Sequence, residues 1–328
     1  MGYRRAMNWR MILAFFGLFT WPAMSFGQSP PSKGEVRAQD GLICSAYFFS
    51  AGPSRHLILT MGGTGLYSNL RLHGEIQSLL KTHPVSYVIF DKPGIQPKKG
   101  GKPGAYKLED EPSFLKHTQD TLMDCAAETL RWGLQQGGGT VQAIHLRGHS
   151  EGSQIALRLY ERLLKEKDPL AAQVQSLLLT GLPIEPWDEI VSQQLQNYPE
   201  KLRNEIQTAM TECDWKVLKK WAGVPCGYLR KQSGAPSNEA TLEGLRLLSP
   251  KVPIYVFHGL NDAHVSAGAV KAFERKNAAH RERNEPSLDF RVLYYEGGHR
   301  SSESVRGKLK SVLQNAIPPF EKGGGGGI

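Results

Sequence analysis

Cysteine is scarce in this chain of 328 residues: there are four, and they form neither a C-x-x-C pair nor the spacing of a zinc site. Basic residues outnumber acidic ones, for a formal net charge of +9, but no basic stripe is interleaved with aromatic side chains. No internal repeat is visible either. We therefore expect no metal site and no nucleic-acid partner, and we exclude a repeat architecture.

Long hydrophobic runs are equally rare, and the clearest one, residues 11–19, lies near the N-terminus behind several arginines. Small residues follow it near Ser25 and Gly27. This order predicts a secretory signal peptide over residues 1–27, cleaved after Gly27 or, as second choice, after Ser25. The run is shorter than the roughly 20 residues of a membrane span. We expect a secreted or periplasmic protein with no stable membrane span after cleavage; the alternative is an uncleaved anchor.

The four cysteines can form disulfides once the chain is in an oxidising compartment. Cys213 and Cys226 lie in one segment and could close a short loop, so we favour that pair. Cys44 falls in a strand-like run and Cys125 in a helical run, and either suits a core position without a partner.

Strand-like and helical runs alternate along residues 28–328, which predicts one α/β domain with a mostly parallel sheet flanked by helices. The expected strands cover 42–50, 56–61, 85–90, 141–146, 174–180, 252–257 and 288–295. The expected helices cover 70–80, 118–134, 155–164, 265–276 and 305–316. We expect the first two strands to form a hairpin around residues 51–54.

Three segments break this alternation. Residues 92–116 are rich in Pro, Gly and Lys and predict a surface loop. Residues 183–250 have helical spacing and predict a small helical insert, either a lid or a packing layer. Residues 318–328 contain a glycine run and predict a disordered tail. If the insert is a lid, its aromatic side chains are candidates for lining an apolar acyl pocket. They are Trp187, Trp215, Trp221 and Tyr228.

Ser150 lies in a Gly-x-Ser-x-Gly pentapeptide between a strand-like run and an apolar helical run. A serine on a sharp strand-to-helix turn needs small neighbours, which Gly148 and Gly152 supply. The turn lifts the hydroxyl clear of the sheet and directs the first amides of the helix at the space above it, where they can stabilise an oxyanion. The pattern predicts a nucleophile; the alternative is a serine that only caps the helix.

A serine nucleophile needs a base and a group that orients the base. Asp262 and His299 each follow a strand-like run directly, so both are expected at the carboxyl edge of the sheet. The chain order of serine, acid and histidine fits this type of sheet. A glycine-rich loop, residues 62–65, follows an early strand and offers backbone amides that would complete an oxyanion hole.

Other side chains compete for these roles. His149 directly precedes the serine, and we expect it to point away as a structural residue. His258 and His264 flank the acid and are candidates for supporting it. Asp91, at the end of another strand, is a rival for the orienting carboxylate. Glu151 is explained by the favourable dipole at a helix N-terminus.

Several motifs together resemble the α/β-hydrolase superfamily, from about Leu42 to the last helix. They are residues 148–152, 258–262, 297–299, 61–65 and 90–94. The resemblance implies that Ser150 is the nucleophile, that His299 is the general base and then acid, and that Asp262 orients it.

The resemblance also implies an oxyanion hole made by the amide of Glu151 and an amide of the glycine-rich loop. Met61 stands where many relatives have a histidine, so the loop donor stays open between Gly63 and Thr64.

We expect an exported serine hydrolase that cleaves a small-molecule acyl substrate at an ester-type bond through an acyl-enzyme, without metal or organic cofactor. A carboxylesterase is favoured over a thioesterase because acyl-CoA is cytosolic. One alternative is an exported aminopeptidase or prolyl-type peptidase, with Glu151, Glu185 or Asp188 as the ammonium anchor. The other is a hydrolase-like binding protein without catalysis.

Overall fold

The computed structural model describes residues 31–50, 52–72, 83–101, 104–221, 223–233, 235–248, 251–299 and 303–317. The predicted signal peptide and the glycine-rich tail lie outside these residues. Most of the helix expected over 70–80 also lies outside them, and its first residues belong to a short 3-10 turn, η2 (Asn69–Leu72). No helix within the described ranges is long and apolar enough to cross a membrane.

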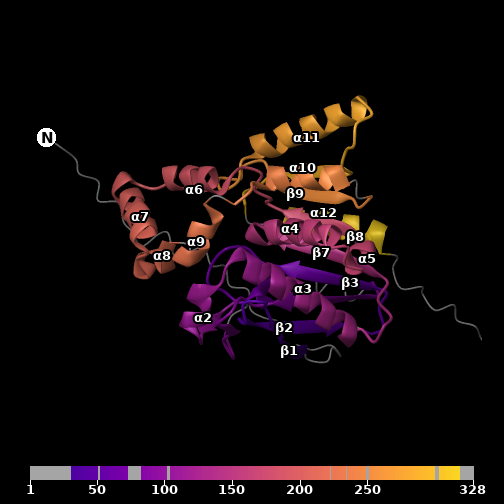
Figure 1. Ribbon diagram of the computed structural model, residues 1–328, viewed down its shortest axis with the longest axis horizontal. Coiled ribbons are helices and arrows are strands. Elements are labelled where there is room, and N and C mark those ends of the chain that lie inside the picture. Colours follow the sequence, from indigo (N-terminus) through magenta and orange to yellow (C-terminus); the bar gives the residue numbers. More distant parts are fainter. Residues whose placement is uncertain are drawn as a thin grey trace, which may run out of the picture.

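An eight-stranded sheet forms the centre of the molecule, in the order β1-β2-β4-β3-β7-β8-β9-β10 (Figure 1). Its strands are β1 (Ser32–Arg37), β2 (Ile43–Ser50), β3 (His56–Met61), β4 (Val85–Phe90), β7 (Ala143–His149), β8 (Val174–Thr180), β9 (Ile254–Gly259) and β10 (Phe290–Tyr295). From β4 to β10 neighbouring strands run parallel, whereas at one edge β2 pairs antiparallel with both β4 and β1. The prediction of a mostly parallel sheet is confirmed.

The hairpin expected between the first two predicted strands is wrong. β2 pairs with β1 and β4, and β3 lies between β4 and β7. β3 is buried from Leu57 to Met61, which requires a neighbour on each side and helices on both faces. The turn residues 51–54 indicate a tight connection, but they do not determine which strands pair. The short strand β1, which pairs with β2, was also missed.

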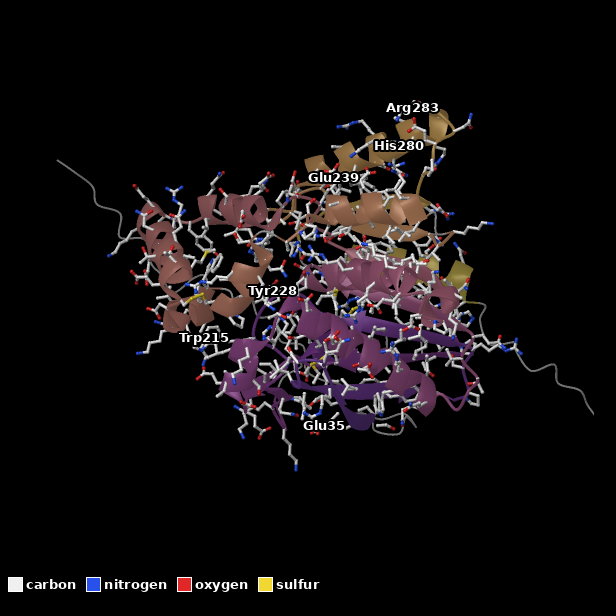
Figure 2. The ribbon with its side chains drawn as sticks, in the orientation of Figure 1. Glu35, Trp215, Tyr228, Glu239, His280 and Arg283 are labelled. Carbon is white, nitrogen blue, oxygen red and sulfur yellow. A yellow bond between two sulfur atoms is a disulfide. The ribbon has the colours of Figure 1, made fainter. Side chains whose placement is uncertain are left out.

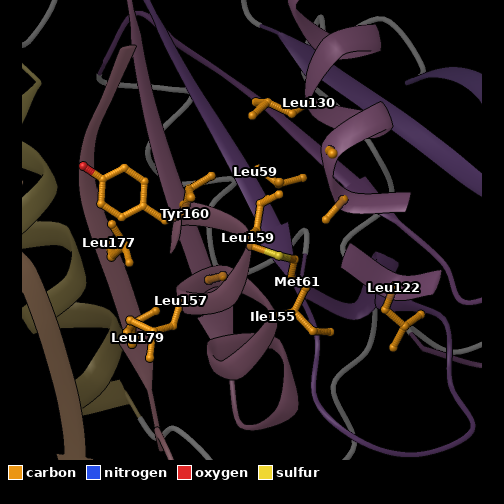
Figure 3. Packing of buried hydrophobic residues seen from close by; sticks show 14 of the residues in the cluster. Leu59, Met61, Leu122, Leu130, Ile155, Leu157, Leu159, Tyr160, Leu177 and Leu179 are labelled. Carbon is orange, nitrogen blue, oxygen red and sulfur yellow. The ribbon is translucent and has the colours of Figure 1, made fainter. Parts of the chain in front are cut away.

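Helices cover both faces of the sheet, which divides the core in two. Side chains alternate between the faces along each strand: Leu57 and Leu59 of β3 belong to the larger cluster and Ile58 to the smaller one. The larger cluster packs against α3 (Gln119–Gln136) and α4 (Glu151–Lys165), and Figure 3 shows part of it. The smaller cluster packs against α12 (Glu303–Ala316). The helices α5 (Leu170–Gln173) and α11 (Ala267–Glu282) also lie beside the sheet.

The segment 92–116 is more ordered than the surface loop expected there. It contains a two-stranded antiparallel sheet, β5 (Ile95–Pro97) with β6 (Tyr106–Leu108), and the helix α2 (Glu111–Lys116). The Asp110 side chain caps that helix by accepting from the amide of Ser113. These elements are too short to produce a hydrophobic period, so composition alone indicated a loop.

The predicted insert, 183–250, is helical but has two parts. The helices α6 (Trp187–Gln196), α7 (Glu200–Glu212), α8 (Trp215–Trp221) and α9 (Cys226–Gln232) form a group at the left of Figure 1, to one side of the sheet. We call α6 to α9 the cap. It has a small core of its own around Val191, Leu195 and Ile206. The last helix of the insert, α10 (Asn238–Leu248), instead contacts α4 beside the sheet.

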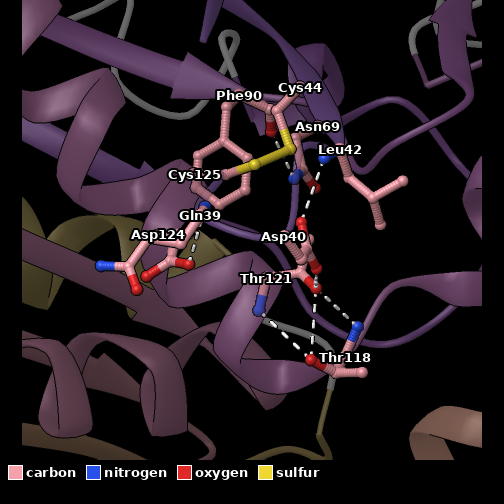
Figure 4. The surroundings of a disulfide bond; sticks show 10 residues. All are labelled: Gln39, Asp40, Leu42, Cys44, Asn69, Phe90, Thr118, Thr121, Asp124 and Cys125. Carbon is pink, nitrogen blue, oxygen red and sulfur yellow. Dashed lines mark hydrogen bonds between the residues drawn. A yellow bond between two sulfur atoms is a disulfide. The ribbon is translucent and has the colours of Figure 1, made fainter. Parts of the chain in front are cut away.

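Both pairs of cysteines form disulfides. Cys213 and Cys226 join the end of α7 to the start of α9 within the cap, as favoured from the sequence. Cys44 of β2 and Cys125 of α3 are also bonded, across 81 residues, so the interpretation of these two as unpartnered core residues is wrong (Figure 4). A pairing between positions so far apart depends on the sheet order, because α3 crosses over the face of β2.

Candidate active site

Ser150 lies on a sharp turn between β7 and α4, with backbone angles φ 54° and ψ −119°. Left-handed φ is unusual for a residue with a side chain and is found at strained functional turns. The two flanking glycines permit the turn: a Cβ on Gly148 would lie 2.2 Å from the carbonyl oxygen of Gly152. A Cβ on Gly152 would lie 2.3 Å from the carbonyl oxygen of Met61. Strand and helix therefore cross at a distance that excludes any side chain at these positions.

Hydrogen bonds to the neighbouring strand fix this turn. The amide of Ser150 donates to the carbonyl oxygen of Thr180, at the end of β8, at 2.8 Å. The hydroxyl of Ser153, one turn into α4, donates to the same oxygen at 2.9 Å. The Ser150 side chain makes no capping hydrogen bond to its own helix. The capping interpretation of this serine is therefore wrong.

Asp262 and His299 meet at the ends of the adjacent parallel strands β9 and β10. His299 Nδ1 lies 2.8 Å from Asp262 Oδ2. The other carboxylate oxygen accepts from the amides of His264 and Val265, at 2.8 and 3.0 Å. The Asp262 side chain is fully buried and that of His299 is 12 % exposed. Because His299 Nδ1 faces the carboxylate, Nε2 is left for a proton from another group.

The pKa of Asp262 is lowered although the side chain is buried. Burial raises the pKa of this carboxyl, but the hydrogen bond and the charge of His299, with the two backbone amides, outweigh it. Asp262 therefore remains an anion that fixes the orientation of the His299 ring.

Ser150 and His299 line one cavity of about 510 Å³, together with Gly63, Thr64 and Glu151. Within the part of the chain that the structure describes, no hydrogen bond joins the side chains of Ser150 and His299. Such contacts often tighten only when a substrate binds. The predicted residues are thus brought to one place, with the serine not yet hydrogen-bonded to the histidine.

The glycine-rich loop after β3 approaches the serine closely. A Cβ on Gly63 would lie 3.1 Å from Ser150 Cβ. Gly62 has no room for a side chain because Asn69 occupies that space. Both Gly63 and Thr64 border the cavity, and the amide of Glu151 begins α4 beside it. Their backbone amides are the candidate oxyanion donors.

Asp91 has other partners than His299. Its carboxylate accepts from the Ser68 hydroxyl at 2.8 Å and from the Asn69 amide at 2.5 Å, and burial raises its pKa to about 7. It anchors η2 rather than a histidine, so the rival assignment of Asp91 as the orienting acid loses its geometric basis.

Three histidines lie near the Asp262–His299 pair, and one of them differs from expectation. The ring of His149 does not point away from the site: it lies 5.2 Å from the His299 ring and borders the cavity. Burial, followed by the charges of His299 and Arg71, lowers the pKa of His149 to about 3, so this ring stays neutral. The ring of His264 also lies 5.2 Å from that of His299. His258 is fully buried.

The cap supplies most of the apolar wall of the cavity. Trp187, Ile190 and Val191 come from α6, and Trp221 comes from α8. Of the other aromatics singled out from the sequence, Trp215 instead donates from Nε1 to Glu111 of α2, at 2.7 Å. Tyr228 is buried where α9 meets the sheet domain; both residues are labelled in Figure 2.

Tyr67 and Arg71 are among the cavity residues that the sequence did not indicate. Both follow the glycine-rich loop, and no motif singles them out. The charge of Arg71, just beyond a predicted oxyanion loop, was the one available signal.

Among the described residues, no group of three or more His, Cys, Asp or Glu side chains is arranged to bind a metal ion.

The fold matches that of many solved structures, although no family model and no curated protein sequence matches the chain. An esterase from Pyrococcus furiosus is 16% identical, with 89% of this chain and 91% of that one covered and a TM-score of 0.57. A lipase in an open form is 16% identical, with coverages of 87% and 97% and a TM-score of 0.58. A thermophilic esterase from Thermogutta terrifontis, with malate bound, is 15% identical, with coverages of 88% and 99% and a TM-score of 0.52. The chain has the α/β-hydrolase fold.

Proposed function

We propose that this chain is a serine hydrolase that cleaves carboxylic ester-type bonds, with Ser150 as nucleophile, His299 as base and Asp262 as the orienting acid. The observation that carries the proposal is the joint placement of the strained Ser150 turn and the Asp262–His299 pair at one cavity. The solved esterases and lipase with the same fold favour ester bonds over other substrates.

The reaction follows from the roles of these groups. Ser150 Oγ attacks the ester carbonyl carbon while His299 Nε2 takes the hydroxyl proton. The negative charge on the carbonyl oxygen faces the amides of Glu151 and of Gly63 or Thr64. His299 then donates its proton to the departing alcohol, and an acyl-enzyme remains on Ser150. Water, deprotonated by His299, attacks that acyl group and releases the acid and the free serine.

The apolar wall supplied by the cap would hold the hydrophobic part of the substrate. Trp187, Ile190, Val191 and Trp221 offer most of this apolar surface. The helices α6 to α9 thus act as a lid that selects substrates, while α10 has a packing role beside α4.

A peptidase that binds the substrate's ammonium group has less support. Glu151 is neutralised by Lys92, whose Nζ lies 2.7 Å from its carboxylate. Asp188 is exposed and accepts from Ser233 at 3.2 Å. Glu185 is not among the residues that line the cavity. An unpaired carboxylate, which such an anchor requires, is thus missing from the described residues of the cavity wall.

Export to an oxidising compartment is part of the proposal. The two disulfides favour it, because such bonds persist in secreted and periplasmic proteins. The predicted leader, residues 1–27, would be removed on the way. Sequencing the N-terminus of the exported protein tests this: a protein that keeps its leader and stays in the membrane would contradict it.

Labelling by a fluorophosphonate tests the catalytic role directly. Wild-type protein should react and Ser150→Ala should not, whereas Ser311→Ala, at an exposed serine of α12 outside the cavity lining, should keep the reaction. Panels of 4-nitrophenyl esters and aminoacyl-naphthylamides then separate an esterase from a peptidase. A folded wild-type protein that neither reacts with the probe nor hydrolyses either panel would be a binding protein, and the proposal would fail.

A further inference from the structure

Of the two charged residues that face the Ser150 cavity, the anion is neutralised by an ion pair and the cation is not. Glu151 and Arg71 carry the formal charges among its described lining residues. Glu151 forms a buried ion pair with Lys92, at 2.7 Å, with side-chain exposures of 2 % and 5 %. His149, with its pKa lowered to about 3, adds no charge near neutral pH. The guanidinium of Arg71 therefore gives the cavity a positive pole without an ion-pair partner among the described residues.

Arg71 is held in place from two sides. Its Cζ lies 3.3 Å from the centre of the Tyr67 ring, so the guanidinium is stacked on the ring. On the other side, the backbone at Gly104 approaches the stem: a Cβ at that position would lie 3.0 Å from Arg71 Cβ. The η2 turn that carries Arg71 is itself anchored by the buried Asp91 through Ser68 and Asn69. The side chain is therefore oriented before any ligand binds.

Stacking leaves the hydrogen-bonding edge of the guanidinium available. An aromatic ring contacts the flat face of the group, whereas its N–H donors point outward in the plane of the group. That edge matches the two oxygens of a carboxylate, which can accept two parallel hydrogen bonds. The nearby hydroxyl of Tyr67 is buried, close to the Arg71 guanidinium and to the backbone of Gly63. It is a further polar group in the same part of the cavity.

We propose that the Ser150 site selects esters that carry a carboxylate on an apolar chain, with Arg71 binding the carboxylate and the cap binding the chain. This rests on the proposed function and names its substrate class. An apolar wall from Trp187 and Trp221 and a fixed cation at Arg71 border the same 510 Å³ cavity. An amphiphilic half-ester matches both parts, whereas a neutral ester offers the Arg71 guanidinium no anionic partner.

A matched pair of substrates tests the proposal: 4-nitrophenyl hydrogen adipate, which carries a carboxylate, and 4-nitrophenyl methyl adipate, which is neutral and has the same chain. The measured quantity is the ratio of kcat/KM for the two, corrected for spontaneous hydrolysis. We expect wild-type protein to prefer the anionic ester and Arg71→Gln to lower the ratio by about 10- to 100-fold, the size of a lost charge-assisted hydrogen bond. Arg71→Lys should restore part of the preference.

Arg283→Gln is the matched control, because it removes the same charge from an exposed residue after α11 that does not line the cavity and lies far from Tyr228 of the cap in Figure 2. Its ratio should equal that of the wild type, and thermal unfolding verifies that each variant is folded. A ratio that is the same in Arg71→Gln and wild type, or a wild-type preference for the neutral ester, overturns the substrate class and leaves the serine hydrolase standing. Absence of both hydrolysis and phosphonate labelling in wild-type protein overturns both.

Discussion

Lys92 Nζ and Glu151 Oε2 lie 2.7 Å apart, and both side chains are almost completely buried directly behind the nucleophile turn. The pair joins the loop after β4 to the first residue of α4. It neutralises a carboxylate that would otherwise oppose the negative charge developing on the substrate next to Ser150. The hydroxyl of Tyr228 in the cap is close to the same carboxylate; burial first, and then this charge, raise the pKa of Tyr228 well above its usual value.

Breaking this pair from one side should be costly. Lys92→Met leaves a buried carboxylate without its counter-charge, and we expect the free energy of unfolding to fall by about 3–5 kcal/mol. Phosphonate labelling of Ser150 should slow as well. The double variant Lys92→Met/Glu151→Gln removes both charges and should recover most of the stability, as measured by denaturant unfolding. Equal stability of the single and double variants would contradict the role of the ion pair.

The orienting acid can be identified with two isosteric substitutions. Asp262→Asn should lower kcat by roughly three to four orders of magnitude, because an amide facing His299 Nδ1 favours the wrong tautomer of the ring. Asp91→Asn should have a far smaller effect, since Asp91 contacts Ser68 and Asn69 and not His299. Ester hydrolysis at substrate saturation measures both. The assignment is wrong if Asp91→Asn is the variant that loses activity.

The candidate catalytic residues could be located from the sequence because each follows a local pattern. The two flanking glycines indicate Ser150, and Asp262 and His299 each lie in the loop just after a strand. Parallel strands end at the same edge of a sheet. Residues that follow neighbouring strands therefore lie close together, regardless of the length and structure of the segment between them. Distances along the sequence of 112 and 37 residues are thereby bridged without knowledge of the packing.

What the sequence did not reveal depends on contacts between distant segments. The pairing of Cys44 with Cys125 requires that α3 crosses the face of β2. The position of β3 in the sheet requires β4 to come between it and β2, although β4 follows later in the chain. No sequence pattern distinguishes Arg71 from other arginines of the chain. Its side chain is held at the cavity by stacking on Tyr67. No local pattern encodes any of these three relationships.

The cap should determine which substrates are hydrolysed rather than whether Ser150 reacts. Trp187→Ala and Trp221→Ala remove apolar surface from the cavity wall, and we expect kcat/KM for esters of long acyl chains to fall by about 10-fold or more, since each lost contact amounts to roughly 1–3 kcal/mol. Hydrolysis of 4-nitrophenyl acetate and labelling by a small phosphonate should change much less. Trp215→Ala is the matched control, because this tryptophan bonds to Glu111 outside the cavity. A selectivity change of the same size in the control would contradict the lid.

The protonation of Asp91 should make the stability of the fold depend on pH. Burial raises its pKa from 3.8 to about 7 in the folded protein, so between these values the unfolded chain loses the proton while the folded protein keeps it. The folded state then binds more protons, and stability falls as pH rises across this interval, by up to ~1.4 kcal/mol per unit. Asp91→Asn cannot titrate. The difference in the free energy of unfolding between wild type and Asp91→Asn, measured in denaturant from pH 4.5 to 8, should therefore shift in favour of the variant up to about pH 7 and then level off. Parallel curves for the two proteins would show that Asp91 is already ionised in the fold, with Ser68 and Asn69 stabilising the anion that anchors η2.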